Sequence, residues 1–178
     1  MFHVKQNMKK TIDTQRLILK NIEYRDKSNL FAFLCDKEVK KTYIVPEFNK
    51  EEEKDRYLSK LIEYCENPDF FIYGIYLNNE LIGMINEVDK KDKNIEVGYV
   101  IDPKHKGNGY ATETLIATTK ELFTLGYEKV LAGFFEENKA SKRVMEKAGM
   151  VKEDYEDDIE YNNTKHHCIY YSITNKQI

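Results

Sequence analysis

Residues 98–115 read GYVIDPKHKGNGYATETL, and this stretch predicts three consecutive structural features. A strand ends at Ile101, because Pro103 breaks it two residues later. Two glycines, Gly107 and Gly109, then stand directly before a run with apolar residues at helical spacing. The pattern predicts a strand, a glycine loop and a helix in that order.

A glycine loop at the start of a helix suits the binding of an anion. The free backbone N–H groups and the positive dipole end of a helix N-terminus bind phosphate or diphosphate. Glycine lets the chain approach such a ligand closely, because it has no Cβ. A simple tight turn before a helix has the same Gly-x-Gly pattern, so the loop alone leaves both interpretations open.

Two nucleotide-binding motifs do not match this loop. A P-loop requires Lys-Ser or Lys-Thr after the last glycine, where this chain has Tyr110 and Ala111. The dinucleotide fingerprint requires a third small residue where Thr112 stands, and it opens a parallel βαβ unit. Here the preceding strands predict an antiparallel meander instead.

Those preceding strands are the runs FFIYGIYL, ELIGMINEV and NIEVGYVI, which short polar turns separate. Consecutive strands with tight connections pair as antiparallel neighbours. Further upstream, TQRLILKNI (14–22) predicts a half-buried strand, and helices are expected at about 29–35 and 49–65.

Downstream, a helix is predicted over residues 110–125, with Gly126 as the residue that ends it. KVLAGFF follows as a buried strand, Asn138 is the expected N-cap of another helix that Gly149 ends, and two strands close the chain. The order predicts a mixed α/β fold with a mostly antiparallel central sheet flanked by helices. We expect one domain over residues 1–178, of which residues 1–10 are a flexible segment.

Composition excludes several classes of protein. Hydrophobic residues make up 41% of the 178 residues, which is too much for a wholly disordered chain. The net charge of -3 disfavours a nucleic-acid-binding role. No apolar run approaches the roughly 20 residues of a membrane span, and the N-terminus lacks the pattern of a secretory signal. We expect a cytoplasmic protein that binds neither nucleic acid nor membrane.

The cysteines and histidines predict neither disulfides nor a metal site. An odd number of widely spaced cysteines favours reduced, part-buried thiols: Cys35, Cys65 and Cys168. His166 and His167 are adjacent on an expected strand, so they point to opposite faces, and no metal-binding spacing accompanies them.

Several stretches together resemble the GNAT superfamily of acetyl-CoA-dependent N-acetyltransferases, and more narrowly its branch of RimJ- and RimL-like ribosomal-protein N-terminal acetyltransferases. These are TQRLILKNI, EVGYVIDPKHKGNGYATETL, ENKASKRVMEKAGM and the strand sequence between them. The resemblance covers nearly the whole chain. It implies a GNAT fold, acetyl-CoA as cofactor without a metal, and transfer of an acetyl group to a primary amine.

The resemblance also implies a cofactor site. The family's diphosphate pattern falls on Lys106, Gly109 and Ala111, and lysine at its first position is a departure that keeps the charge but loses the guanidinium fork. A splay between NIEVGYVI and KVLAGFF would admit the pantetheine arm. The cofactor-binding residues implied are Tyr99, Val100, Ile101, Lys106, Gly107, Asn108, Gly109, Tyr110, Ala111, Thr112 and Asn138.

Amide formation requires a base, an oxyanion donor and an acid. By resemblance Glu96 is the expected base, directly or through water, although a carboxylate on a solvated sheet face has the same pattern. Ser141 is the expected acid or thiolate contact, although Asn138 and Ser141 also fit a plain helix cap. Many GNAT enzymes have a tyrosine donor where this chain has Met145, which cannot donate a proton.

The acceptor stays open between a ribosomal or other protein N-terminus, a polyamine, and an antibiotic or amino-acid amine. We expect direct transfer in a ternary complex, because no cysteine is near the cofactor motifs in the sequence. A noncatalytic acyl-CoA-binding module is the alternative, a nicotinamide enzyme is a more distant one, and the chain is expected to be a monomer or a homodimer.

Overall fold

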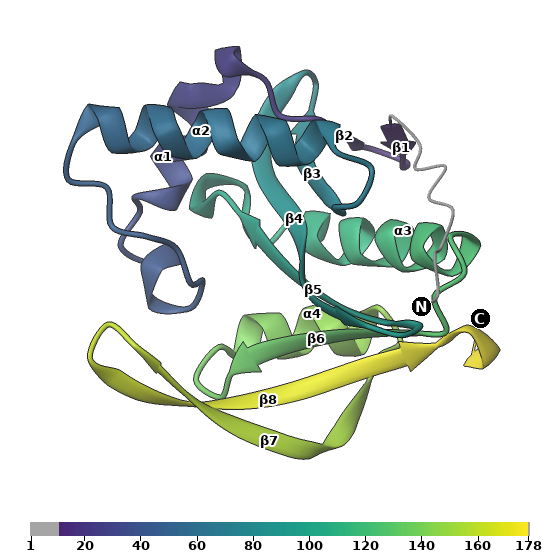
Figure 1. Cartoon of the computed structure of the whole chain (residues 1–178). Coiled ribbons are helices and arrows are strands. Elements are labelled where there is room, and N and C mark those ends of the chain that lie inside the picture. The colour runs from purple at the N-terminus through teal and green to yellow at the C-terminus, as the bar shows by residue number, and fades with distance from the viewer. Residues whose placement is uncertain (1–10, 178) are drawn as a thin grey trace.

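The computed structural model describes residues 11–177, so the predicted flexible segment 1–10 lies outside the described residues. Eight strands form one open sheet in the order β1-β2-β3-β4-β5-β6-β8-β7, in which only the β5–β6 pair is parallel (Figure 1). Four α-helices accompany the sheet in this part of the chain. The predicted mixed α/β fold with a mostly antiparallel sheet is confirmed.

The strands are β1 (Thr11–Asp13), β2 (Ile18–Lys20), β3 (Ile72–Leu77), β4 (Glu80–Lys91), β5 (Asn94–Ile101), β6 (Lys129–Phe135), β7 (Val151–Tyr161) and β8 (Thr164–Thr174). The helices are α1 (Lys27–Leu34), α2 (Glu51–Glu66), α3 (Tyr110–Thr124) and α4 (Lys139–Lys147).

Short turns join the hairpins. Asn78 and Asn79 connect β3 to β4, and Asn162 and Asn163 connect β7 to β8, all four with positive φ. Asparagine tolerates the left-handed conformation that two-residue hairpin turns require. The expected antiparallel pairing follows from these turns.

The N-terminal strand is shorter than predicted. Only Ile18–Lys20 of the stretch 14–22 is extended, because the backbone N–H of Thr14 donates to the carbonyl of Leu17 and closes a turn. A further strand, β1, pairs with β2 across this turn. The alternation of Leu17 and Leu19 did predict burial, since both are buried.

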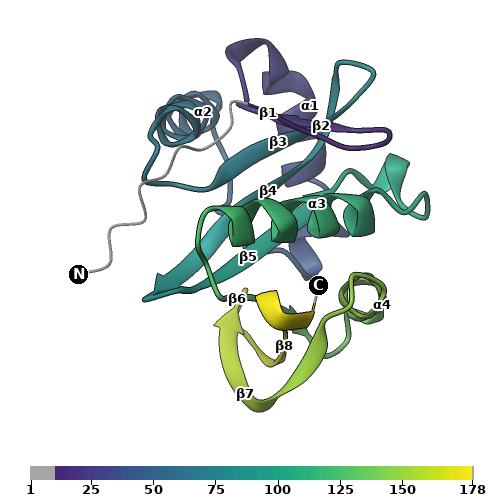
Figure 2. The ribbon, with the colours of Figure 1, turned by 90° about the vertical axis from the view of Figure 1, so that its right-hand side faces the viewer.

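Helices cover both faces of the sheet. One core joins Leu115 of α3 and Met145 of α4 to Val97, whereas the other joins Leu30 of α1 and Leu58 of α2 to residues on the opposite face. Figure 2 shows α3 lying across β4 and β5. Each face of β5 thus packs against a different pair of helices.

The sheet splits between β5 and β6. These strands pair only from Asn94 to Glu96, opposite Lys129 to Leu131. Beyond Glu96, β5 remains paired with β4 alone, while β6 continues along β8. The predicted splay is therefore present, and it leaves backbone groups of β5 without a strand partner on one side.

Candidate active site

A cavity of about 450 Å³ lies where β5 and β6 separate. Its walls come from the two splayed strands, the glycine loop with the start of α3, the first turns of α4, and the segment after α1. All the predicted site residues line it except Glu96 and Asn108. The lining members among them are Tyr99, Val100, Ile101, Lys106, Gly107, Gly109, Tyr110, Ala111, Thr112, Asn138 and Ser141.

The glycine loop has the backbone geometry of an anion site. Gly107 and Gly109 adopt φ of 81° and 82°, a left-handed conformation that side chains rarely adopt. The N–H of Glu113 donates to the carbonyl of Gly109, which makes this the first intrahelical bond of α3. The N–H groups of residues 110–112 therefore precede any intrahelical acceptor and are available to a ligand.

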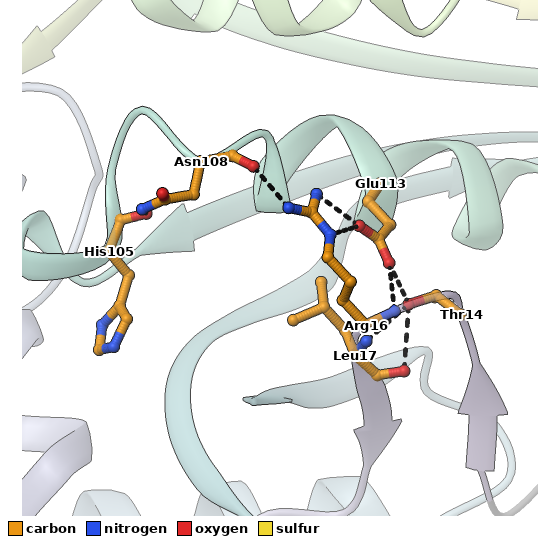
Figure 3. A network of polar contacts seen from close by, with 6 residues as sticks. All are labelled: Thr14, Arg16, Leu17, His105, Asn108 and Glu113. Carbon is orange, nitrogen blue, oxygen red and sulfur yellow. Dashed lines mark hydrogen bonds and ion pairs between the residues drawn. The ribbon is translucent and has the colours of Figure 1, made fainter. Parts of the chain in front are cut away.

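Asn108 supports the loop from within. Its side-chain amide donates to the carbonyls of His105 at 3.0 Å and Lys106 at 3.3 Å. The Asn108 side chain thus holds the loop's own backbone, and the expectation that Asn108 contacts the cofactor stays a prediction. Figure 3 shows this residue beside Arg16, which sequence reasoning did not single out.

Asn138 and Ser141 make two hydrogen bonds with each other at the start of α4. The carbonyl oxygen of the Asn138 side chain accepts from the Ser141 N–H at 3.2 Å, as the predicted N-cap requires. Its amide nitrogen donates to the Ser141 Oγ at 3.0 Å. Because Oγ accepts this bond, the hydroxyl proton of Ser141 is free to donate toward the cavity.

The Tyr99 hydroxyl lies beside the same turn and donates to the Ser141 carbonyl at 3.4 Å. Burial raises the pKa of Tyr99 above its ordinary value. The phenol therefore stays protonated at neutral pH, and it lines the cavity next to Ser141. Its side chain adds a second hydroxyl to the site, a role that was not predicted for Tyr99.

Glu96 lies on the same face of β5 as Gly98, outside the cavity lining. Burial raises the pKa of Glu96, and the charge of Asp89, its cross-strand neighbour on β4, raises it further. The carboxylate is thus two residues from a cavity-lining glycine in an environment that favours proton uptake. A solvated sheet face does not describe this partly buried site.

Sequence reasoning also missed Tyr43, which follows a short helical turn after α1. Tyr43 lines the cavity, and its hydroxyl donates to the Asn86 Oδ1 at 2.7 Å. A Cβ added to Gly98 would lie 4.0 Å from the Tyr43 ring, so the two residues are neighbours in the cavity lining. No local pattern around Tyr43 indicates this position, because the contact joins residues 43 apart.

No cysteine is near the cofactor motifs in the sequence, but the fold brings one, Cys168, close to a residue that lines the cavity. Cys168 on β8 lies opposite Phe135, and its Sγ is 3.3 Å from where a Cβ on Gly133, a cavity-lining residue, would lie. Cys168 is 4% exposed, and burial raises the pKa of its thiol. A buried thiol with a raised pKa is a poor nucleophile.

The three cysteines are unpaired: Cys65 and Cys168 are buried and Cys35 is half-buried, as predicted. Among residues 11–177 no group of three or more histidine, cysteine or acidic side chains could hold a metal ion. His166 contacts Glu137, whereas His167 contacts Glu156 and Asp158. Within the described helices, none is long and apolar enough to cross a membrane.

A splayed sheet with a glycine loop at the mouth of the split defines the acetyltransferase class of α/β proteins. The model of the acetyltransferase (GNAT) domain family matches residues 16–151, and the chain belongs to this family. The uncharacterized N-acetyltransferase YoaA of Bacillus subtilis is 30% identical over 147 residues, which cover 80% of this chain and 83% of YoaA. YnaD of the same organism, also an uncharacterized N-acetyltransferase, is 29% identical over 148 residues, covering 81% and 84%.

Solved structures have the same fold. A GNAT-family acetyltransferase from Bacillus anthracis superposes with a TM-score of 0.81 at 29% identity, covering 93% of this chain and 99% of that one. RimL, a ribosomal-protein alpha-N-acetyltransferase, was solved with coenzyme A and has a TM-score of 0.79 at 17% identity, covering 92% and 97%. The protein is an acyltransferase of the GNAT family, with structural neighbours in the RimJ- and RimL-like branch, and this membership supports acetyl transfer from acetyl-CoA.

Proposed function

We propose that the protein transfers an acetyl group from acetyl-CoA directly to a primary amine of a protein N-terminus or a small molecule, within a ternary complex. The observation that carries this proposal is the continuity of the cavity. It runs from the glycine loop, through the split between β5 and β6, to Gly98 and Tyr43 on the side of α1. A donor and an acceptor entering from opposite ends would meet beside Ser141.

The residues of the loop fit a diphosphate. The N–H groups at Gly107, Gly109 and the first turn of α3 are suited to bind its oxygens, and Lys106 adds a positive charge at the same end of the cavity. The unpaired backbone of residues 97–101 on β5 is suited to hydrogen-bond the amides of the pantetheine arm. When bound, acetyl-CoA supplies a thioester carbonyl that an amine can attack.

Glu96 is the proposed general base, acting through water because it does not line the cavity. Its raised pKa brings it closer to neutral pH, which improves a carboxylate as an acceptor of the amine proton. The negative charges of Glu96 and Asp89 would also attract a cationic amine to this end of the cavity.

Ser141 is the proposed proton donor to the departing thiolate. Asn138 occupies one lone pair of its oxygen and directs the hydroxyl proton away from the helix. The protonated Tyr99 hydroxyl lies nearby, and it would be a second donor only by giving up its bond to the Ser141 carbonyl. With Ser141 or Tyr99 as the donor, no proton donor is needed at position 145. Met145, which occupies it, is 1% exposed and packs in the core.

Direct transfer is favoured over a covalent acyl-enzyme. Cys168 is the cysteine placed closest to the cavity by the contacts described above, yet its buried thiol has a raised pKa and does not line the cavity. The amine would therefore attack the bound thioester itself.

The test is thiol release from acetyl-CoA in the presence of a panel of amines: peptides with free N-termini, polyamines, amino acids and aminoglycosides. We expect release with at least one class, and its loss in the Glu96→Gln variant with coenzyme A affinity retained. Tight coenzyme A binding without release in any class would instead support a noncatalytic acyl-CoA-binding module.

A further inference from the structure

Arg16 ties the N-terminal hairpin to the first turn of α3 (Figure 3). It lies in the turn between β1 and β2, 97 residues from Glu113 in sequence. Its Nη2 and Nε both lie 2.7 Å from the Glu113 Oε2, and its backbone N–H donates to Oε1 at 2.8 Å. Thr14 donates its hydroxyl to the same Oε1 at 2.6 Å. Glu113 is therefore held by side-chain and main-chain donors from one turn.

The remaining arm of the guanidinium reaches the glycine loop. The Arg16 Nη1 donates to the carbonyl of Asn108 at 2.9 Å, and the guanidinium carbon lies 4.7 Å from the centre of the Tyr110 ring. One side chain thus contacts the loop carbonyl, the first residue of α3 and the acidic residue of its first turn. The planar fork of arginine makes these contacts simultaneously, which a lysine cannot do.

The bond to the Asn108 carbonyl determines where a ligand-facing N–H points. In a trans peptide the carbonyl oxygen and the N–H of the following residue point in opposite directions. Arg16 holds the Asn108 oxygen on its own side, so the N–H of Gly109 is directed away from Arg16. The Asn108 side chain does the same for Gly107 by holding the Lys106 oxygen. Neither glycine restricts the peptide orientation by itself.

Arg16 also balances the charge of Glu113. Burial would raise the pKa of Glu113, but hydrogen bonds from Thr14 and Arg16 together with the Arg16 charge lower it below its ordinary value. Glu113 is thus ionised at neutral pH, one turn from the loop that would meet a dianionic diphosphate. The adjacent guanidinium cancels this unfavourable charge.

We propose that Arg16 is a positioning residue that holds the Gly107–Gly109 loop in its diphosphate-binding conformation, without being part of the cavity lining. This inference rests on the proposed function, in which that loop binds the diphosphate of acetyl-CoA. If Arg16 acts by positioning this loop, replacing it should raise the KM only of acetyl donors that carry the diphosphate.

The test compares two acetyl donors, acetyl-CoA and S-acetylpantetheine, which has the thioester arm but no diphosphate. For Arg16→Gln we expect the KM for acetyl-CoA to rise about tenfold, the size expected for loss of charged hydrogen bonds, with kcat retained. The kcat/KM for S-acetylpantetheine should stay at the wild-type value. Arg16→Lys keeps the charge without the fork, and should give a smaller rise.

Arg25→Gln is the matched control, because Arg25 also pairs with a glutamate, Glu23 at 3.0 Å, away from the cavity lining. Arg25→Gln should leave the kinetic constants for both acetyl donors at their wild-type values. An equal fall in kcat/KM for both donors in both Arg16 variants would show a general structural role and overturn the inference. An unchanged KM for acetyl-CoA would also overturn it. Failure of the wild-type protein to bind coenzyme A in calorimetry would instead overturn the proposed function itself.

Discussion

Asn138 makes two hydrogen bonds with one side chain, which explains why a plain helix cap and the proposed catalytic role of Ser141 could not be separated by pattern alone. Its oxygen satisfies the Ser141 N–H and its nitrogen orients the Ser141 hydroxyl. An N-cap needs only the first of these bonds. The second is not needed for capping, and because the Ser141 Oγ accepts it, the hydroxyl proton stays available for another acceptor. At the scale of single residues, the amide nitrogen of Asn138 is the atom that distinguishes helix capping from orientation of the Ser141 hydroxyl.

Replacing Ser141 with alanine should lower kcat about 100-fold, the lower range of contributions from a positioned proton donor. The dissociation constant for coenzyme A should not change, because the loop and β5 are untouched. Steady-state kinetics and calorimetry measure the two quantities. An undiminished kcat would transfer the acid role to the Tyr99 hydroxyl or to water.

Asn138→Asp separates capping from hydroxyl orientation. Aspartate caps a helix as well as asparagine, but it cannot donate to the Ser141 Oγ. We expect an unchanged melting temperature and a reduced kcat. A normal kcat would show that the Asn138 amide does not orient the reacting hydroxyl.

The pH dependence of kcat/KM for the amine should report Glu96. Because the base must be deprotonated, activity is lost as pH falls through its pKa, which burial and then Asp89 raise above the ordinary glutamate value. Asp89→Asn removes a negative charge that raises the pKa of Glu96, so the acidic limb of the pH profile of kcat/KM should move to lower pH. Asp92→Asn, in the turn before β5 where asparagine tolerates the positive φ of 56°, is the control and should leave the limb in place. An unmoved limb in both variants would exclude Glu96 as the group observed.

At the scale of elements, the strand–loop–helix unit of β5 and α3 is responsible for the site. The loop contains two glycines in the left-handed conformation. On one side of it β5 is no longer paired with β6, and on the other the first backbone N–H groups of α3 have no carbonyl within the helix to bond. Both conditions leave backbone donors and acceptors without partners in the fold. Such groups are costly to bury unless a ligand satisfies them.

Gly109→Ala tests this unit against a matched glycine at the other end of α3. Gly109 and Gly126 have φ of 82° and 98°, so alanine at either position should destabilise the fold by about 1 kcal/mol. Gly109→Ala should in addition weaken coenzyme A binding at least tenfold, because it displaces the loop N–H groups. Thermal melting and calorimetry distinguish the effects. Equal coenzyme A affinity in the two variants would contradict the loop's proposed role.

At the scale of the whole molecule, the proposed acceptor end of the cavity, at Tyr43, is supported by a segment 118 residues away in the sequence. Tyr161, at the end of β7, donates its hydroxyl to the carbonyls of Tyr43 at 3.3 Å and Val45 at 3.5 Å. His166 on β8 stacks on Phe135, with ring centroids 4.2 Å apart. Figure 1 shows the tip of the β7–β8 hairpin extending beneath this part of the chain. The hairpin therefore supports the segment that presents Tyr43.

Tyr161→Phe should raise the KM for the amine by about fivefold, the size of one lost hydrogen bond, and leave the KM for acetyl-CoA unchanged. The change frees the segment around Tyr43, which lines the proposed acceptor end of the cavity. Tyr24→Phe is the control, because its hydroxyl contacts only the Ser59 hydroxyl, at 3.4 Å, among the hydrogen bonds of residues 11–177. A rise in the acetyl-CoA KM instead would show that the hairpin acts on the donor end.

The amino-acid sequence by itself determined most of the elements and their order, with β1 as the missed strand. The strands NIEVGYVI and KVLAGFF, the N-cap at Asn138 and the stop at Gly126 all lie where periodicity and capping chemistry predicted them. These features depend on residues within one or two turns of each other, so a linear pattern contains them. The family pattern likewise located the glycine loop, because its members, Lys106, Gly109 and Ala111, lie within one short stretch of sequence.

The tertiary structure alone decided which distant residues share the site. It brought Arg16 to Glu113, placed Tyr43 against Gly98, moved Cys168 close to Gly133 and left Glu96 outside the cavity lining. It also cut the predicted strand 14–22 to three residues by closing a turn at Thr14. The physical reason is that these contacts depend on sheet order and on the divergence of β5 from β6. Neither the order nor the divergence leaves a periodic signal in the chain.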